Sequence, residues 1–358
     1  MATSSILDLG TKPTRSVAVS SVKELANLKS IPSSYVHPTM TNCEASDSRP
    51  DDGSIPIIDF SLLVSDDPDE RSRMIEELGK ACRNWGFFMV VNHGVGVDLM
   101  QAILDDCNEF FNLTTEEKLE FQGKHVLDPI RYGTSFNASV EKSYFWRDFL
   151  KAFVHPLFNF PNKPPGFSEL ANEYCSKIRR LTNELLKGIS ASLGLEPSYI
   201  AKALNLESSL QIFITNYYPP CPEPELAIGI APHSDHGILT LLIQNGIGGL
   251  QIMHDGRWVE VNPISNSLLV NTGDHLEILS NGKYKSVLHR AVVNNKATRI
   301  SLAVADGPSL DAIVSPAPEL LDSEENLAKY RPMKYKEYLV AQQSNPISGK
   351  SALDRVRI

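Results

Sequence analysis

The sequence predicts an α+β protein in which helices pack on one face of a strand-rich core. Between Phe167 and Leu195, apolar residues recur every three or four positions, as they do along one face of a long amphipathic helix. After Leu210 the period changes, and short β-branched runs alternate with turn residues. Runs of this kind favour an antiparallel sandwich or barrel over a βαβ sheet.

The N-terminal part of the chain predicts an arm, a strand, a helix and a second strand, in that order. Residues 1–53 are rich in Ser, Thr, Asp and Pro, which predicts a flexible arm. The apolar run at 55–60 predicts the first strand. From Asp66, acidic residues and a proline indicate the start of a helix that ends at Gly86. The apolar run that follows predicts a buried strand.

Six apolar runs in the second half of the chain predict further strands. They cover residues 210–218, 238–245, 249–261, 267–273, 285–293 and 299–305. The third run contains Asp255-Gly256, a dipeptide typical of a hairpin turn. Because helices come first and strands follow, the order of elements supports the α+β class.

Composition excludes several kinds of protein. The chain has 358 residues, of which 42% are hydrophobic and 22% charged, so it can bury a core. Its formal charge of -9 opposes binding to nucleic acid or to an anionic membrane. Acidic small molecules stay possible as substrates, because a few arginines inside a pocket can outweigh a negative exterior. No apolar run reaches the roughly 18 residues of a membrane span.

The cysteines and the N-terminus predict a reducing compartment. The five cysteines are odd in number and include no CxxC pair, which argues against a disulfide framework and against a cysteine zinc site. The first residues lack the apolar stretch of a secretory signal. We therefore expect a soluble, cytoplasmic protein, and we expect it to be a monomer.

Three residues form a candidate metal site. His233 and Asp235 are two positions apart in a segment predicted to be extended, where such side chains share a face. One such pair carries little weight, because chance gives about one His-x-acid match and His275-Leu276-Glu277 is another. His289, in a separate predicted strand, completes two histidines and one carboxylate. This set leaves positions open on iron for O₂ and a chelating co-substrate.

A candidate carboxylate clamp follows ten residues after His289. Arg299 and Ser301 are two apart in the last predicted strand, so they share a face. A guanidinium holds a carboxylate in a fork, and a serine hydroxyl can add another hydrogen bond. The pair therefore indicates a site for an acidic co-substrate.

Four segments carry a family resemblance: NYYPPCPEPELAIGIAPHSD, GGLQIMHDGRWVEV, NTGDHLEILSNGKYKSVLHRAV and RISLAVADGP. They resemble the plant 2-oxoglutarate and iron(II)-dependent dioxygenases, and IPIIDF and CRNWGFFMVVNHG are similar to the N-terminal region of that family. The resemblance runs from Ile55 to Tyr338 and implies a double-stranded β-helix, or jelly roll. It implies an N-terminal region at 54–165, a catalytic jelly roll with its supporting helix at 166–340, and a tail at 341–358.

The resemblance also implies a role for each candidate residue. Those implied for Fe(II) are His233, Asp235 and His289, and those implied for 2-oxoglutarate are Arg299, Ser301, Tyr218 and Asn216. With O₂, and with ascorbate in support, such a site would hydroxylate, demethylate or desaturate an apolar plant metabolite and release succinate and CO₂. The middle and end of the chain look similar to hydroxylases of bulky specialised metabolites, including steroidal alkaloids.

Six positions match pocket-lining positions of flavonoid-oxidising relatives and are expected to contact the substrate: Phe149, Lys151, Phe153, Ile214, Ala305 and Gly307. The sequence departs from those relatives at Ala305 and Gly307, where they tend to carry an aromatic ring and a carboxylate. Loss of a stacking ring disfavours a flat flavonoid by about 1 kcal/mol and leaves room for a thicker alicyclic skeleton.

Two other functions remain open at this point. One is an oxidase of the same fold that uses no 2-oxo acid, against which the intact clamp argues. The other is a catalytically silent protein that binds a small molecule, against which the complete ligand set argues. Of the remaining histidines, His236 is expected at a loop or rim, and His275 with Glu277 is expected to be structural.

Overall fold

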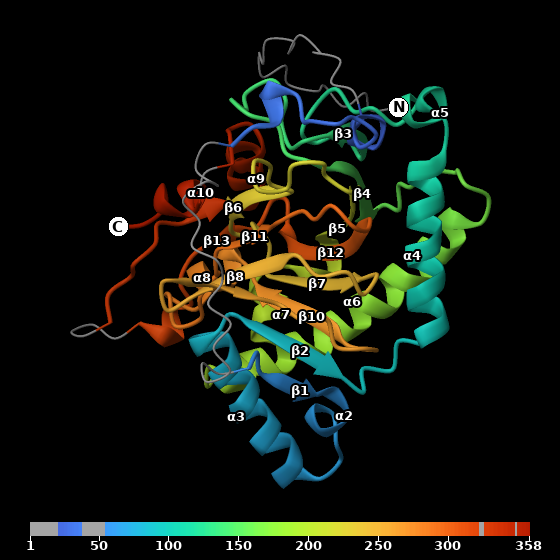
Figure 1. Ribbon diagram of the computed structural model, residues 1–358. Helices are drawn as coiled ribbons and strands as arrows, with labels where there is room; N and C mark the ends of the chain where they lie inside the picture. The colour runs from blue at the N-terminus through green and yellow to red at the C-terminus, as the bar shows by residue number, and fades with distance from the viewer. Residues whose placement is uncertain (1–20, 38–53, 322–325, 348) are drawn as a thin grey trace, which may run out of the picture.

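The computed structural model describes residues 21–37, 54–321, 326–347 and 349–358 (Figure 1). The strands are β1 (Ile57–Asp59), β2 (Phe87–Val91), β3 (Ile130–Thr134), β4 (Asp148–His155), β5 (Ser209–Tyr218), β6 (Ile230–His233), β7 (Leu239–Gln244), β8 (Leu250–His254), β9 (Arg257–Glu260), β10 (Leu268–Thr272), β11 (His289–Ala291), β12 (Arg299–Ser309), β13 (Ile313–Val314) and β14 (Met333–Lys334). The helices are α1 (Val22–Leu25), α2 (Phe60–Leu63), α3 (Pro68–Asn84), α4 (Val97–Asn112), α5 (Thr115–Leu119), α6 (Phe167–Ser192), α7 (Tyr199–Ala203), α8 (Asp274–Leu279), α9 (Tyr335–Gln343) and α10 (Ser351–Asp354), with 3₁₀ turns η1 (Ser33–Tyr35), η3 (Leu206–Ser208) and η4 (Pro318–Leu320).

Two sheets form the core of the molecule and enclose a cavity that residues of both sheets line. The larger sheet has eight strands in the order β1-β2-β10-β7-β12-β5-β4-β3, and the smaller has four in the order β6-β11-β8-β9. Neighbouring strands in both sheets are antiparallel, except β1 and β2 of the larger sheet. These two strands are parallel, and Ile57 lies opposite Met89. The predicted antiparallel strand-rich core, and with it the jelly-roll expectation, is confirmed.

The helices α4 and α6 cover one face of the eight-stranded sheet, and α3 packs beside α6 (Figure 1). The predicted long amphipathic helix is confirmed as α6. Its apolar residues Ile178, Leu181, Leu185 and Ile189 are buried along one side. Burying each such side chain stabilises the fold by about 1.5–3 kcal/mol. None of the described helices combines the length and the apolar composition that a bilayer span needs.

Among the elements that the sequence pattern does not predict are the helix α4 and the strands β3 and β4. The strand β4 pairs with β3 on one side and with β5 on the other, so it extends the large sheet. Its residues are buried on both faces, and Lys151 interrupts its apolar run. Strands are predicted from the spacing of apolar residues, so a buried lysine within the run makes the strand hard to recognise in the sequence.

The pair formed by β5 and β12 decides which side chains enter the cavity. Tyr218 lies opposite Arg299, and Asn216 lies opposite Ser301. Because side chains alternate along a strand, these four share the face that lines the cavity. Tyr217 points to the other face, where its ring lies 5.1 Å from that of Phe111 in the core.

Part of the predicted N-terminal arm is packed on the molecule, which corrects the expectation of a flexible arm. Residues 21–37 are described, and Val22 and Tyr35 are buried there. The backbone N–H of Val22 donates to Asp148 Oδ1 at 3.2 Å, and the Tyr35 ring meets the Trp146 ring edge-on at 5.3 Å. These two apolar side chains fix the segment. The rest of the predicted arm lies outside the described residues.

The C-terminal tail is also built into the fold. The buried Glu277 carboxylate accepts from Lys350 Nζ at 2.9 Å and from Arg357 Nη2 at 3.2 Å. These ion pairs hold the last residues against α8. As a result, residues 342, 343, 346, 347 and 349–352 line the cavity.

Candidate active site

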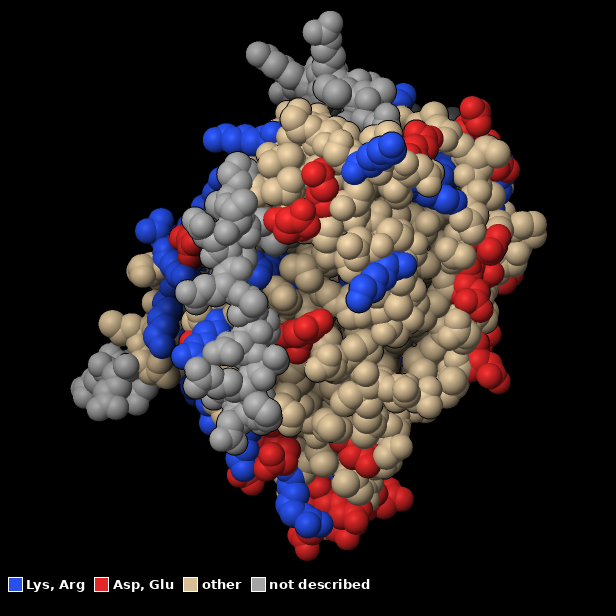
Figure 2. Space-filling model, viewed as in Figure 1, with Lys and Arg blue, Asp and Glu red and all other residues tan. Residues whose placement is uncertain are grey.

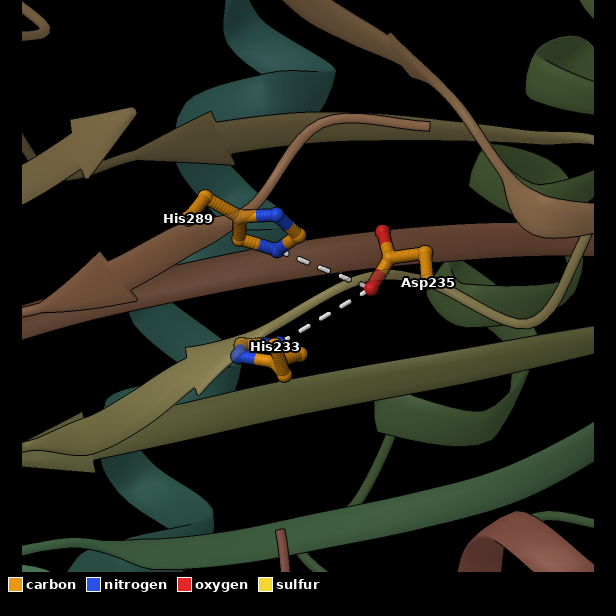
Figure 3. Close-up of side chains that lie close together, drawn as sticks. All are labelled: His233, Asp235 and His289. Carbon is orange, nitrogen blue, oxygen red and sulfur yellow. Dashed lines mark ion pairs between the residues drawn. The ribbon is translucent and has the colours of Figure 1, made fainter. Parts of the chain in front are cut away.

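Two histidines and one aspartate meet where β6 ends beside β11 (Figure 3). His233, the last residue of β6, lies opposite His289, the first residue of β11. Asp235 lies past the end of β6 rather than within a strand, which differs from the expectation of one extended segment. Its Oδ1 lies 3.6 Å from His289 Nε2 and 3.8 Å from His233 Nε2. One metal ion can reach all three atoms at these separations.

Backbone carbonyls set the orientation of both imidazoles. His233 Nδ1 lies 2.9 Å from the carbonyl oxygen of Ala231, and His289 Nδ1 lies 3.2 Å from that of Val287. With each Nδ1–H donated to a carbonyl, each Nε2 keeps its lone pair and faces Asp235. This is the arrangement in which a histidine binds a metal.

Two neighbouring side chains orient the Asp235 carboxylate. Its Oδ2 accepts hydrogen bonds from Thr240 Oγ1 at 2.7 Å and from Asn271 Nδ2 at 2.8 Å. Thr240 comes from β7 and Asn271 from β10, so the large sheet holds a ligand of the small one. Oδ1 is thereby directed toward the histidines and away from these donors.

The charge states of the triad suit a divalent cation. Burial, together with repulsion from His289, lowers the pKa of His233 to about 3, so this imidazole is neutral near pH 7. Burial alone raises the pKa of Asp235, but attraction to the two histidines and the two hydrogen bonds hold the pKa below its ordinary value. A neutral imidazole and an ionised carboxylate are the forms that bind metal.

Arg299 lies in the same cavity, on the face of β12 that carries Ser301. It is 2% exposed, and its guanidinium lies 5.1 Å from the centre of the Tyr218 ring. Nη2 donates to Gln244 Oε1 at 2.8 Å, and Nε has no hydrogen-bond partner among the described residues. A buried guanidinium with an unused Nε donor and no ion-pair partner among the described residues fits a carboxylate ligand such as that of 2-oxoglutarate.

Asn216 and Ser301 lie beside this guanidinium. Asn216 Nδ2 donates to Ser301 Oγ at 3.4 Å, and Asn216 Oδ1 accepts from Arg147 Nη1 at 2.7 Å. The sequence did not single out Arg147, which is buried and lines the cavity. It precedes β4, an element that the pattern did not predict, so only the paired strands bring it to Asn216.

Four of the six positions expected to contact substrate line the cavity, and two do not. The four are Phe149, Lys151, Ile214 and Ala305. Phe153 instead packs in a cluster with Tyr335 and Leu339 of α9. Gly307 lies against the Tyr335 hydroxyl, 2.0 Å from where a Cβ would stand. Helix α9 covers this end of the large sheet, which corrects the expectation for both residues.

The other histidines take structural positions. His236 lies in the loop that follows β6, as expected, and it lines the cavity. It is 7% exposed, and its Nδ1 lies 2.8 Å from the Tyr335 hydroxyl. His275 is fully buried, and its Nδ1 is hydrogen-bonded to the carbonyl of His236. Glu277 holds the C-terminal segment, as described above. The structural expectation for His275 and Glu277 is confirmed.

Two family profiles match the chain. Residues 209–306 match the 2OG-Fe(II) oxygenase superfamily, and residues 55–170 match the non-haem dioxygenase in morphine synthesis N-terminal family. The first match spans all three candidate iron ligands and the candidate clamp residues. The second covers the region that the sequence placed ahead of the jelly roll.

Named relatives agree with these matches. The chain is 48% identical over 305 residues to 2-oxoglutarate-dependent dioxygenase 19 of Oryza sativa subsp. japonica, which covers 85% of this chain and 90% of that protein. It is 36% identical to oxoglutarate-dependent flavonoid 7-O-demethylase 1 of Ocimum basilicum, over 96% of this chain and 92% of the relative.

A solved structure extends the agreement to three dimensions. The crystal structure of JOX2 in complex with 2OG, Fe and JA superposes with a TM-score of 0.85 at 33% identity, over 95% of this chain and 98% of that one. Fold, family profiles and relatives all point to one class. The chain therefore belongs to the 2OG-Fe(II) oxygenase superfamily and is an Fe(II)- and 2-oxoglutarate-dependent dioxygenase.

Proposed function

We propose that this dioxygenase hydroxylates or demethylates an apolar plant specialised metabolite, with Fe(II) bound by His233, Asp235 and His289. The observation that carries the proposal is the presence, in one cavity, of this triad and of the buried Arg299 guanidinium. Iron(II) would supply the activation of O₂; 2-oxoglutarate would give two of the four electrons and leave as succinate and CO₂, and the substrate would give the other two.

The residues of the chain position the co-substrate. Arg299 and Ser301 hold its distal carboxylate, while Tyr218 and Asn216 lie beside it on the paired strand. Gln244 fixes the guanidinium plane through Nη2, which leaves Nε to donate to the ligand. The clamp supports a 2-oxo-acid-dependent enzyme over an oxidase of the same fold.

The substrate occupies the remaining part of the cavity. Phe149, Ile214 and Ala305 offer it apolar surface, and Lys151 offers a charge. Relatives named for a flavanone and for a flavonoid support an apolar metabolite as the substrate. The small Ala305 side chain leaves room for a skeleton thicker than a flat flavonoid.

We also propose that the enzyme is a cytoplasmic monomer that needs no nucleic-acid partner, with ascorbate as a supporting reductant. The described cysteines Cys82, Cys107, Cys175 and Cys221 are all free and buried, which suits a reducing compartment. On the face in Figure 2, basic side chains lie mostly along the left side and acidic ones along the right edge and the bottom. The formal charge of -9 over the whole chain does not favour a phosphate backbone.

The first experiment is anaerobic binding of Fe(II) and 2-oxoglutarate, followed through their visible charge-transfer band. Wild type should form the band and should release succinate when air is admitted. Arg299→Ala should weaken 2-oxoglutarate binding about 10–100-fold, because a charge-assisted hydrogen bond to a carboxylate is lost. The exposed Arg73→Ala serves as the matched control and should bind as wild type does.

The two other functions predict different results. An oxidase without a 2-oxo acid would bind iron but would form no 2-oxoglutarate band. A silent binding protein would form neither the band nor succinate in folded, iron-loaded protein. Either result would overturn the proposal.

A further inference from the structure

Three basic side chains line the end of the cavity formed by β3 and β4. Arg131 lies on β3, Lys151 lies on β4, and Arg147 directly precedes β4. All three line the cavity, and Lys151 is only 7% exposed. Buried positive charges are costly unless an anion accompanies them.

Arg131 and Lys151 lie directly opposite each other in the antiparallel pair of β3 and β4. Side chains opposite each other on antiparallel strands share a face, and like charges at such positions destabilise the pair. The sheet therefore places two basic groups on one face, where their positive charges repel each other. An anion between them would convert this repulsion into attraction.

None of the described acidic residues forms an ion pair with these three side chains. Lys151 Nζ donates to the neutral Gln343 Oε1 at 3.0 Å. Arg147 donates through Nε to the carbonyl of Ser135 at 2.8 Å and through Nη1 to Asn216 Oδ1 at 2.7 Å. The Arg131 guanidinium lies 5.9 Å from the centre of the Phe149 ring and makes no hydrogen bond to a described residue.

The nearby acids are engaged elsewhere and do not line the cavity. Asp128 Oδ2 accepts from the backbone N–H groups of Lys124 and His125, the latter at 2.9 Å. Glu141 Oε1 accepts from the backbone N–H of Ile347 at 2.8 Å. Among the described residues, neither carboxylate forms an ion pair with the basic cluster.

The charges at the other end of the cavity balance without the basic cluster. The formal charges sum to zero when Fe(II), the Asp235 carboxylate, the Arg299 guanidinium and the 2-oxoglutarate dianion are counted together. Of the other charged groups in the lining, Lys350 is paired with Glu277, and Asp274 accepts a hydrogen bond from the Tyr338 hydroxyl at 2.6 Å. The positive charge at β3 and β4 is therefore left for the substrate.

An apolar row runs from the basic cluster across the large sheet. Lys151 lies opposite Ile214, Ile214 opposite Ala303, and Ala303 opposite Leu242. All of them line the cavity, between the basic end and the strands that hold Asp235. A ligand that fits this row has an acidic group at one end and an apolar body along the rest.

We infer that the substrate is an apolar organic acid whose carboxylate is bound by Arg131 and Lys151, with its body on Ile214, Ala303 and Leu242. This inference rests on the proposed function for its chemistry, but binding of the acid can be measured without that chemistry. It names the substrate as an acid where the sequence predicted only an apolar metabolite. Arg147 adds positive charge and ties this end to Asn216 of the co-substrate site.

Calorimetric titration of the full chain, without iron or 2-oxoglutarate, tests the inference. The probes are trans-cinnamic, 4-phenylbutanoic and cholic acids, each compared with its methyl ester, which keeps the body and removes the charge. At least one acid should bind about tenfold or more tightly than its ester, as a charge-assisted hydrogen bond predicts. Arg131→Gln and Lys151→Met should each lower the affinity for that acid about tenfold and should leave the ester within about twofold.

Two controls keep the result interpretable. The exposed Lys202→Met makes the same substitution far from the cavity and should retain the preference for the acid. Lys151→Met keeps most of the buried stem and removes a repelled charge, so it should fold at least as stably as wild type. Arg131→Lys should restore part of the preference.

The outcomes separate this inference from the proposed function. Equal binding of every acid and its ester, or undiminished acid binding by both variants, overturns the inference even where the 2-oxoglutarate band forms. Absence of that band in wild type overturns the proposed function, while a preference for the acid that needs Lys151 still supports the acid-binding site.

Discussion

Asn271 donates a hydrogen bond to Asp235, with 2.8 Å between Nδ2 and Oδ2. Thr240 donates to the same oxygen at 2.7 Å, so both contacts hold Asp235 Oδ1 toward the two histidines. Neither Asn271 nor Thr240 has a ligand atom in the triad. They are positioning residues, and the sequence motif does not include them.

Asn271→Leu should weaken Fe(II) binding about 10–100-fold, because an unsupported carboxylate loses its orientation. Thr240→Val should act in the same direction, and Thr240→Ser, which keeps the hydroxyl, should restore binding. Anaerobic titration with Fe(II) gives the dissociation constants. Unchanged affinity in both Asn271→Leu and Thr240→Val would show that the triad orients itself.

Binding of an acidic substrate should weaken as the pH rises above about 7. Burial, with repulsion from Arg131 and Arg147, lowers the pKa of Lys151 to about 7. His236 also faces this amine, and its pKa is low, so His236 is neutral in this range. A bound carboxylate favours the protonated lysine, so affinity is full at lower pH and falls up to about tenfold per pH unit above it.

The measurement is the dissociation constant of the acid that binds most tightly, from about pH 6 to about pH 9. Lys151→Arg is the matched variant, because a guanidinium stays protonated across this range. Its affinity should be independent of pH. An equal decline in wild type and Lys151→Arg would assign the effect to another group.

Gly307→Ala should destabilise the protein by about 1–3 kcal/mol, as overpacking of a closed site does. A Cβ at this position would stand 2.0 Å from the Tyr335 hydroxyl, and Tyr335 is fully buried. Urea unfolding measures the change. The control is Gly96→Ala, where a Cβ meets nothing within 4 Å, and it should cost less. A neutral Gly307→Ala would mean that Tyr335 moves aside freely.

Glu277→Gln should destabilise the C-terminal segment by about 2 kcal/mol, since charge-assisted hydrogen bonds from Lys350 and Arg357 are weakened. Burial raises the pKa of Glu277, but attraction to Lys350 and the hydrogen bonds hold it below its ordinary value. The folded-state pKa is thus depressed, so this contribution is present above about pH 4.5 and is lost as the pH falls through the lower folded value.

Limited proteolysis checks the Glu277 prediction, because a loosened segment should be cut after Gln343 faster than in wild type. The exposed Glu207→Gln is the control and should be cut at the wild-type rate. Residues 342, 343, 346, 347 and 349–352 line the cavity, so Glu277→Gln should also raise the KM for the substrate. Wild-type cleavage and an unchanged KM together would contradict the role of this ion-pair cluster.

The sequence by itself determined the class of this protein. The long helix and the β-branched runs show their periods directly, because each period follows from local backbone geometry. His233, Asp235 and His289 are found from residue type and spacing, and the alternation along β5 correctly separates Tyr217 from Tyr218. Their roles as ligands and as a clamp remain predictions, which the titrations above test.

The tertiary structure decided what surrounds the triad. Arg131 and Lys151 become neighbours only when β3 pairs with β4, and the sequence contains no signal for the register of that pair. Helix α9 covers Phe153 and Gly307, although strand alternation alone would leave both open to the cavity. Contacts between residues far apart in the chain depend on how the elements pack. The spacing of apolar residues within one element carries no information about that packing. The candidate metal ligands can therefore be found from the sequence, whereas the shape and charge of the cavity around them are decided by the fold.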